Sequence, residues 1–387
     1  MNQIKKKRPP IQKNNSENSV HSVKKTRCLV PLLLDWFATN ARDLPWRRTR
    51  DPYAIWVSEI MLQQTQVKTV MPYWARWMRE LPTIESAAAA SPDKIHKLWE
   101  GLGYYTRARN LQKAAQEIVK GGKRKVESGN AEFPHTFKEV LALPGIGRYT
   151  AGAICSIAFN QPTPILDGNV IRVLTRVFGI AENPKENKTN RLLWKLAEKL
   201  VGRALRCPPY QNRCSRLNQS LMELGALVCT PRNPQCLICP IKKECVAFRK
   251  NRIDELPNLG KREKATARRF IAFVVERDGK FLVRQRPAGI VNAHFWEFPN
   301  VEMVNGNSNP KLAAKTIFGI EPAKLEHFHT LKHSITRYRI TLDAFQVQLK
   351  NHGNISDGIW RTHSQLQRLA FSSAHKKILT KLGGAQK

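Results

Sequence analysis

The sequence predicts a mainly α-helical chain that ends in a smaller α+β domain. From Leu29 to about Ala247, apolar residues recur at intervals of three and four positions, which is the period of an amphipathic helix. From about residue 269 onward, two apolar runs that flank the turn Arg277-Asp278-Gly279-Lys280, and an alternating run over 338–349, indicate strands instead. A charged stretch without periodicity, 249–268, separates the two parts and is predicted to be a linker. The 387 residues are enough for two or three domains, each with its own core.

Local sequence indicates where individual elements begin and end. In the first part, runs separated by Pro or Gly predict helices over 31–41, 51–78, 91–103 and 107–121. Asp51-Pro52 and Ser91-Pro92 are typical helix starts. In the second part, 269–387, the expected elements are a β-hairpin of 270–276 and 281–286, a strand over 338–349, and helices over 311–318 and 373–382.

A tight turn between two predicted helices carries the most informative motif. One helix is expected to end near Leu143, Pro144-Gly145-Ile146-Gly147 forms the turn, and the next helix begins around Tyr149. Such a helix-hairpin-helix directs backbone amides and a helix N-terminus outward, where they can bind a phosphate. Asp167 follows in the next loop and supplies a carboxylate near this turn. Together these features predict chemistry beside a clamp for a nucleic-acid backbone.

The charge of the chain also indicates a polyanionic partner. There are 65 Lys and Arg residues against 30 Asp and Glu, which gives a formal charge of +35 and a pI of about 10.3. A surplus of this size allows many cationic side chains to displace counterions from nucleic acid. Charge alone leaves RNA or an acidic membrane surface as alternatives.

The N-terminal residues and the hydropathy of the chain predict where it works. Residues 1–27 carry eight Lys and Arg and one acid, and are expected to form a disordered basic arm. Within it, Lys5-Lys6-Lys7-Arg8 fits either a nuclear address or a DNA tether. No apolar run approaches the roughly 18 residues of a membrane span, and no secretory segment is present. We expect an intracellular protein without a membrane partner, in the cytoplasm or nucleoid of a bacterium, or in the nucleus of a eukaryote.

Four of the eight cysteines lie within a short stretch. Cys229, Cys236, Cys239 and Cys245 have the spacing Cys-x6-Cys-x2-Cys-x5-Cys. In a chain without an export signal, this spacing favours a metal or cluster over disulfides. Soft sulfur ligands suit zinc or iron–sulfur, and the spacing alone leaves both open. Cys207 and Cys214 form a competing ligand set, whereas Cys28 and Cys155 lie in helical runs and are expected to be buried.

These motifs together resemble the DNA glycosylase superfamily that includes endonuclease III. Within that superfamily, WVSEIMLQQTQV, WEGLGYYTRARNL, LDGNVIRVLTR and LMELGALVCTPRNPQCLICP are similar to the adenine DNA glycosylases. The resemblance covers 30–247. It implies a two-lobed helix-hairpin-helix glycosylase domain, 28–248, with DNA bound between the lobes. It also implies a 4Fe–4S cluster on the four cysteines of the loop 229–245.

One position distinguishes the branches of this superfamily. The branch with lyase activity has a lysine just after the hairpin, and its amine forms a Schiff base with the sugar. This chain has Tyr149 there, and a phenol cannot form the imine. The resemblance therefore implies a glycosylase that does not cut the strand, with Tyr149 beside the oxocarbenium. A packing role for Tyr149 at the helix start is the alternative.

Two carboxyl groups are candidates for the chemistry. Breaking an N-glycosidic bond develops positive charge on the sugar and negative charge on the departing purine, so an acid and a carboxylate can share the work. Glu59 lies in an apolar helix, where desolvation would raise its pKa, and the matching family residue protonates adenine N7. Asp167 begins the helix of 169–174, where backbone dipoles favour its ionised form. A paired surface residue at Glu59 and a simple helix cap at Asp167 are the alternatives.

The resemblance assigns further residues by matched position. Asn169 is expected to orient the attacking water or Asp167. The residues expected to contact DNA are Arg47 and Gln219 at the extruded adenine with Trp46 nearby, Gln64 and Tyr104 as wedges in the duplex, and Gly145 and Gly147 at a phosphate. Each wedge residue has an ordinary core or surface role as its alternative.

The C-terminal part resembles the Nudix-like module that inspects 8-oxoguanine in this family. The positions of the glutamates that bind magnesium in Nudix hydrolases hold Ala313, Thr316 and Ile317, so we expect no pyrophosphatase activity. Where the family has a Phe-Ser-His turn, this chain has Leu331-Lys332-His333. Lys332 and His333 are the candidates for contact with the oxidised base or a phosphate.

The sequence thus predicts a monomeric, monofunctional adenine DNA glycosylase with a 4Fe–4S cluster. Its expected partner is double-stranded DNA that contains adenine opposite 8-oxoguanine, and also opposite guanine. A thymine or uracil mismatch glycosylase of the same fold is the enzymatic alternative. A non-catalytic iron–sulfur protein that binds DNA or senses redox state is the alternative from another class.

Overall fold

The computed structural model describes residues 17–121, 131–208, 210–261, 265–303, 309–335, 337–349, 355 and 357–384. Their contacts divide the chain into two compact units. The first contains Met1–Trp56, Pro134–Ala142 and Ile146–Gly260, and the second contains Val57–Phe133, Leu143–Gly145 and Lys261–Lys387. The predicted domains 28–248 and 269–387 follow the sequence, whereas the contacts group the helical residues 57–133 with the C-terminal part. Among the described residues, no helix is long and apolar enough to cross a membrane.

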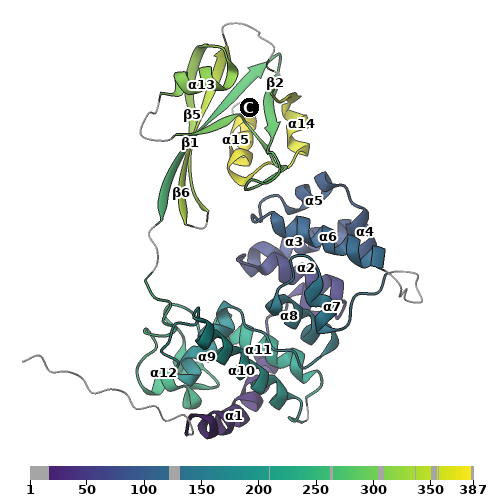
Figure 1. The fold of residues 1–387 in the computed structure, drawn as a ribbon, viewed down its shortest axis with the longest axis vertical. Helices are drawn as coiled ribbons and strands as arrows, with labels where there is room; N and C mark the ends of the chain where they lie inside the picture. The colour runs from purple at the N-terminus through teal and green to yellow at the C-terminus, as the bar shows by residue number, and fades with distance from the viewer. Residues whose placement is uncertain are drawn as a thin grey trace, which may run out of the picture. The chain divides into compact units, whose positions relative to one another are not determined.

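The first unit is helical (Figure 1). Its elements are α1 (Glu17–Asn40), η1 (Pro45–Arg47), the start of α2 (Pro52–Leu62), α7 (Phe137–Ala142), α8 (Arg148–Phe159), α9 (Gly168–Phe178), α10 (Asn187–Ala204), α11 (Arg213–Leu227), η2 (Cys236–Ile238), η3 (Lys242–Glu244) and α12 (Val246–Arg249). Apolar residues of α1, α8, α9, α10 and α11 form one core, with Leu34, Leu193 and Leu217 among its most buried members.

The N-terminal arm differs from the prediction. α1 begins at Glu17, so 17–27 of the arm predicted to be disordered are helical. Leu29, Val30, Leu33 and Leu34 of α1 are buried in the core of the first unit, and the helix extends from them toward the N-terminus. Residues 1–16, which include Lys5-Lys6-Lys7-Arg8, lie outside the described residues.

The predicted helix-hairpin-helix is present. α7 ends at Ala142, and α8 begins at Arg148 with Gly147 as its capping residue. Gly145 has a φ of +77°, which disfavours any residue with a Cβ. A Cβ at Gly145 would also lie 2.6 Å from the Cβ of Asn110. The turn therefore requires glycine at this position for two independent reasons.

The helical part of the second unit contains the rest of α2 together with α3 (Val67–Glu80), α4 (Ile84–Ala89), α5 (Pro92–Trp99) and α6 (Thr106–Gly121). The predicted starts at Asp51-Pro52 and Ser91-Pro92 are confirmed, because both side chains accept amide hydrogen bonds from the first turn of their helix. The periodic run over 51–78 forms two helices instead of one. The helix stops because Gln64 adopts a left-handed backbone conformation between α2 and α3.

The C-terminal part of the second unit contains a mixed sheet. Its strands are β1 (Thr266–Arg277), β2 (Lys280–Gln285), β3 (Trp296–Glu297), β4 (Asn300–Met303), β5 (Pro322–Ile335), β6 (Tyr338–Leu349) and β7 (Ile359–Thr362). The order is β3-β2-β1-β6-β5, with β4 paired to β1 and β7 to β2. β1 and β6 run parallel, and the other pairs are antiparallel.

Helices cover the sheet on its two faces (Figure 1). They are α13 (Pro310–Phe318), α14 (His363–Arg368) and α15 (Ser373–Gly384). Alternate residues of β1 face opposite layers, because Phe273 packs in a cluster with Phe318 of α13, and Val274 in one with Ile378 of α15. The predicted hairpin is confirmed, since Arg277 and Lys280 pair across the Asp278-Gly279 turn.

Candidate active site

Asp167, a predicted catalytic residue, caps the N-terminus of α9. Its Oδ1 accepts a hydrogen bond from the amide of Val170 at 2.7 Å, and its Oδ2 accepts one from Nδ2 of Asn169 at 2.9 Å. Burial raises the pKa of Asp167, although these hydrogen bonds and the charge of Arg172 act in the opposite direction. The helix terminus thus favours the ionised form, as expected, but desolvation outweighs it.

Asn169 and the buried Arg172 connect Asp167 to the cysteine segment. Arg172 donates from Nη2 to Oδ1 of Asn169 at 2.8 Å and to the carbonyl of Gly225 at 2.8 Å. Its Nε donates to the carbonyl of Cys229 at 2.7 Å. A Cβ at Gly225 would lie 2.6 Å from the Cβ of Asn169, so α11 approaches α9 closely at this point. The Asp167 carboxylate is therefore connected through Asn169 and Arg172 to the carbonyl of Cys229, and these contacts fix its orientation.

Tyr149 lies in the first turn of α8, in the position where the lyase branch has its lysine. Its side chain is half-buried, and its hydroxyl donates to Sδ of Met222 on α11 at 3.3 Å. It also packs against the core of the first unit. The packing role is therefore real, and the phenol is held in the same unit as Asp167.

Arg47, predicted to contact adenine, is held by a buried carboxylate. Its Nη1 and Nη2 donate to the two carboxylate oxygens of Glu223 at 3.0 and 2.9 Å. Arg42 binds the same oxygens from Nε and Nη2 at 2.8 and 2.7 Å. Burial opposes ionisation of Glu223, but the arginines prevail and lower its pKa to about 2. Glu223 was not among the predicted site residues, although a single acid in the apolar segment 221–228 could have indicated a buried ion pair.

The two remaining candidates of the first unit lie on different elements. Trp46 is in η1 next to Arg47 and is only 5 % exposed. Gln219 is on α11, one turn before Glu223, and its Nε2 donates to Oγ of Ser215 at 3.0 Å. The first unit thus holds Asp167, Asn169 and Tyr149 together with Arg47, Trp46 and Gln219.

Glu59 belongs to the second unit. It lies near the end of α2 and is 5 % exposed, so the alternative of a surface residue is wrong. Its neighbours in sequence, Ser58 and Ile60, are buried as well. The burial matches the expectation for a carboxyl group in an apolar helix.

Gln64 and Tyr104, the predicted wedge residues, share an unusual backbone conformation. Their φ angles are +57° and +46°, a region that costs a non-glycine residue about 1–2 kcal/mol. Both side chains are exposed, and Tyr104 is 42 % exposed despite its aromatic ring. Backbone strain of this kind is concentrated at functional sites. Gly145 and Gly147, the predicted phosphate contacts, are also exposed.

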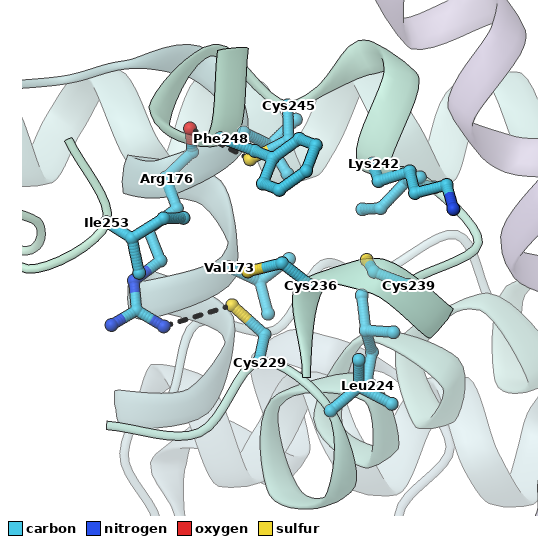
Figure 2. A pocket seen from close by; sticks show the side chains of 13 residues that line it. Val173, Arg176, Leu224, Cys229, Cys236, Cys239, Lys242, Cys245, Phe248 and Ile253 are labelled. Carbon is cyan, nitrogen blue, oxygen red and sulfur yellow. Dashed lines mark hydrogen bonds between the residues drawn. The ribbon is translucent and has the colours of Figure 1, made fainter. Parts of the chain in front are cut away.

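The four clustered cysteines line one pocket of the first unit (Figure 2). Apolar side chains such as Val173, Leu224 and Ile253 form its walls, and its lining contains no histidine or carboxylate. Arg176 donates from Nη1 to Sγ of Cys229 at 3.4 Å, as the dashed line in Figure 2 shows. Burial, with the neighbouring thiols, raises the pKa of Cys239 to about 12. Among the described residues, no group of three or more His, Cys, Asp or Glu side chains is arranged to hold a metal ion.

The donor set of this pocket fits a metal or cluster with sulfur ligands alone. All four thiols face one opening, and the competing pair is not part of it, because Cys207 and Cys214 are absent from the lining. An apolar wall excludes water from bound sulfur, and a guanidinium beside Cys229 can offset the charge of thiolates. The pocket thus fits the four-cysteine assignment better than the alternative ligand set.

Lys332 and His333 lie within a strand and not in a turn. Both belong to β5, where they pair with Thr341 and Ile340 of β6. Leu331 is buried and Lys332 is exposed, as the alternation of a strand requires. Nδ1 of His333 is buried without a hydrogen-bond partner among the described residues, and burial lowers the pKa of His333. Leu331-Lys332-His333 is therefore part of a strand, and the turn expected at these residues is not formed there.

β5 ends at Ile335 and β6 starts at Tyr338, so the two strands are joined by a short turn. Arg337 is in this turn, and its Nη2 donates to the hydroxyl of Tyr338 at 3.2 Å. On the other layer, α13 carries Ala313, Thr316 and Ile317 and contains no acidic residue. The helix that would supply magnesium ligands in a Nudix hydrolase has none here.

Comparison with known proteins finds a family match for each of the two parts of the chain. Residues 57–199 match the HhH-GPD superfamily base excision DNA repair proteins, and 271–381 match the NUDIX domain. The adenine DNA glycosylase of Rattus norvegicus is 34 % identical over 89 % of this chain and 76 % of its own length. The adenine DNA glycosylase of Buchnera aphidicola subsp. Baizongia pistaciae is 34 % identical over 90 % of this chain and 95 % of its own length. Among solved structures, a thermostable thymine-DNA glycosylase has a TM-score of 0.50 at 32 % identity and covers 59 % of this chain and 98 % of its own.

Proposed function

The chain belongs to the adenine DNA glycosylase family, and from that premise we propose that it removes adenine paired with 8-oxoguanine or with guanine. Membership makes it a DNA glycosylase of base excision repair. The observation that carries the finer proposal is the Asp167 carboxylate, held at the N-terminus of α9 by Val170 and Asn169. Double-stranded DNA with such mispairs is the proposed partner.

The proposed reaction divides the work between two carboxyl groups. The C1′–N9 bond breaks, and its electron pair leaves with adenine while the Glu59 carboxylic acid gives a proton to N7. The ionised Asp167 stabilises the positive charge that develops on the deoxyribose. A water molecule then forms the new bond to C1′ and passes its proton to a carboxylate. The burial of Glu59 supports its role as an acid, and Asn169 supports Asp167 by donating to Oδ2.

We propose hydrolysis without strand cleavage. A lyase reaction needs an amine that forms a Schiff base with C1′, and the matched position holds Tyr149. The phenol is bound to Met222 and is suited to contact the charged sugar. Incubation of the protein with its DNA substrate, without alkali, tests this. Intact strands are expected. Strand breaks, or a covalent protein–DNA adduct after reduction with borohydride, would contradict the proposal.

We propose that Cys229, Cys236, Cys239 and Cys245 hold a 4Fe–4S cluster. The pocket with sulfur donors alone supports this, as does membership in a family that binds such a cluster. When bound, the group would cross-link the segment 229–245 and supply a fixed structure there. Iron and sulfide analysis, with visible absorbance of the purified protein, tests the proposal. Colourless protein with one equivalent of zinc would contradict it.

The C-terminal domain is proposed to read the base opposite adenine. Lys332 is exposed on β5, and Arg337 is in the turn between β5 and β6, so both offer donors to an oxidised base or a phosphate. Replacing each by Ala should reduce the preference for 8-oxoguanine over guanine and leave excision opposite guanine within about threefold. An unchanged preference in both variants would remove this part of the proposal.

A mismatch glycosylase acting on thymine is the second candidate, because the solved thymine-DNA glycosylase is 32 % identical over 98 % of its length. One assay separates the candidates. The purified protein is incubated with duplexes that carry adenine opposite 8-oxoguanine, adenine opposite guanine, or thymine opposite guanine, and alkali then reveals abasic sites. Breaks at adenine alone support our proposal, breaks at thymine favour the second candidate, and no breaks would favour a non-catalytic DNA-binding protein.

A further inference from the structure

We propose that Arg107 positions the two residues, Gln64 and Tyr104, that enter the duplex when adenine is extruded. The inference rests on the proposed function, because the resemblance to adenine DNA glycosylases implies that Gln64 and Tyr104 act as wedges. Arg107 itself contacts the backbone of the two loops that carry them and is therefore a positioning residue.

The first loop is held through its carbonyl groups. Nη1 of Arg107 donates to the carbonyls of Ile60 at 2.8 Å, Met61 at 3.1 Å and Gln63 at 2.6 Å. These are the last carbonyls of α2 and of the turn after it, which have no partner within the helix. The guanidinium thus determines where α2 ends and where the backbone of Gln64 begins.

The second loop is held by the other end of the same guanidinium. Nη2 of Arg107 donates to the carbonyls of Leu102 at 3.2 Å and Gly103 at 3.1 Å. The carbonyl of Tyr104 accepts from the backbone amide of Arg107 at 2.9 Å. Cζ of Arg107 lies 5.6 Å from the centroid of the Tyr104 ring. Both wedge loops therefore converge on one side chain.

The backbone conformation shows why such an anchor is needed. Gln64 and Tyr104 both have positive φ angles, +57° and +46°, although neither is glycine. A strained residue keeps such a conformation only where its surroundings impose it. The hydrogen bonds of Arg107 lie directly before each strained residue, at Gln63 and Gly103.

Only arginine provides this arrangement. Its planar fork of donors can bind two separate groups of carbonyls at fixed angles, whereas lysine offers a single ammonium. Burial lowers the pKa of Arg107 to about 10, so the side chain is still charged at neutral pH. Trp99 supports the same position, because its ring lies 5.4 Å from Cζ of Arg107 and its Nε1 donates to the carbonyl of Gly103 at 3.2 Å.

The test compares Arg107→Lys with a matched control, Arg109→Lys. Arg109 is two residues further along α6 and binds the carbonyl of Ala293 and the hydroxyl of Thr106 instead. Single-turnover excision is measured on adenine opposite 8-oxoguanine, and extrusion is followed by 2-aminopurine fluorescence at the target position in an Asp167→Asn background. Arg107→Lys should slow excision about tenfold to a hundredfold and remove most of the fluorescence rise, with DNA affinity nearly unchanged. Arg109→Lys should behave like the parent protein.

A double-mutant cycle shows whether Arg107 acts through the wedge residues. In a protein that already carries Gln64→Ala and Tyr104→Ala, Arg107→Lys should have no further effect on the fluorescence. A full additional effect there, or slow excision with normal fluorescence, would overturn the proposal. If Arg107→Lys does not fold, Trp99→Phe tests the loop of Tyr104 alone, and normal extrusion in that variant would count against the anchor. Failure of the parent protein to excise adenine would refute the proposed function, and the fluorescence cycle would still report on Arg107.

Discussion

At the scale of single residues, two carboxyl groups of the first unit, the half-buried Asp167 and the buried Glu223, have pKa shifts of opposite sign. Asp167 accepts hydrogen bonds from a backbone amide and an asparagine, and burial still raises its pKa. Glu223 is only 1 % exposed, but four donors from Arg42 and Arg47 lower its pKa to about 2. The hydrogen-bonded arginines of Glu223 thus outweigh burial, whereas the hydrogen bonds of Asp167 and the charge of Arg172 do not.

We expect Asp167→Asn to abolish excision and preserve the fold. Loss of the carboxylate should slow single-turnover excision by at least about a hundredfold, because the charge on the sugar is then unopposed. Because the pKa of Asp167 is raised, its ionised form is less favourable in the folded chain than in the unfolded chain. This penalty is present at pH values above the ordinary pKa of an aspartate. Asparagine removes this penalty and still caps α9, so the melting temperature at pH 7 should stay equal or rise. Normal excision, or a large fall in melting temperature, would contradict this assignment.

Glu223→Gln is expected to destabilise the first unit. It leaves Arg47, whose side chain is 15 % exposed, without its buried counter-charge, at a cost of about 2–4 kcal/mol. The pKa of about 2 lies below the ordinary 4.5, so this stabilisation is present at neutral pH and declines as pH falls from 4.5 toward 2. Urea unfolding measures the loss. Glu198→Gln, which breaks the exposed pair with Arg148, is the control and should cost less than about 0.5 kcal/mol; equal losses would show that burial is not the cause.

At the scale of elements, α9 serves two sites at once. Its N-terminus presents Asp167 and Asn169, and its next two turns direct Arg172 and Arg176 toward the segment of Cys229. The two arginines are four residues apart and therefore lie on the same side of the helix. They differ in one respect, because Arg172 also holds Asn169, whereas Arg176 binds the carbonyls of Leu256 and Thr230.

This difference predicts separate effects of the two arginines. Arg172→Gln should lower both the excision rate and the amount of bound iron, because Asn169 and the carbonyl of Cys229 lose a donor. Arg176→Gln should lower iron content or shift the visible absorbance, with a smaller effect on the rate measured per bound cluster. Iron analysis, absorbance and single-turnover kinetics on both variants provide the comparison. If both variants lose the same excision rate per bound cluster, Arg172 does not connect Asn169 to the cysteine segment in a way that matters for excision.

Elements determined by neighbouring residues were predictable, and contacts between distant residues were not. The turn at Gly145, the hairpin at Asp278-Gly279 and the start of α5 all follow from short-range chemistry. The pair of Arg42 and Glu223 joins residues 181 positions apart, and no local pattern encodes it. The run over 51–78 predicts one helix for the same reason, because Arg107, which binds the carbonyls at the end of α2, is remote in sequence. Lys332 and His333 were placed in a turn because a short triplet does not define its register in a hairpin.

At the scale of whole units, the second unit combines helices from the middle of the chain with the C-terminal sheet. Glu100 accepts a hydrogen bond from the amide of Phe371 at 2.8 Å, and its Oε2 lies 3.4 Å from Nζ of Lys376. Tyr105 packs on Phe295, with ring centroids 3.8 Å apart. The loop that carries Tyr104, which we propose as a wedge residue, is thus bordered on both sides by residues that contact the C-terminal part.

The same unit contains two buried histidines that predict its response to acid. His96 on α5 packs against Phe295, with ring centroids 4.9 Å apart, and His375 lies on α15. Burial lowers the pKa of each to about 4 from an ordinary 6.5; nearby Arg109 and His294 act in the same direction on His96, whereas Glu297 opposes the shift of His375. As pH falls below 6.5, the unfolded chain takes up these protons before the folded one does. Each histidine should therefore cost up to about 2 kcal/mol of stability at pH 5.

The variant His96→Phe tests this dependence. It removes one titrating group while an aromatic ring still packs against Phe295, so the urea midpoint should fall less between pH 7 and pH 5 than in the parent protein. The exposed His327, replaced by Asn, is the control for the loss of a histidine at the surface. Amide hydrogen exchange in α5 at the same pH values reports whether the contact of His96 with the C-terminal part opens first. If His96→Phe and the parent lose stability in parallel, other groups are responsible for the acid sensitivity, and the buried histidine does not stabilise this contact through its neutral form.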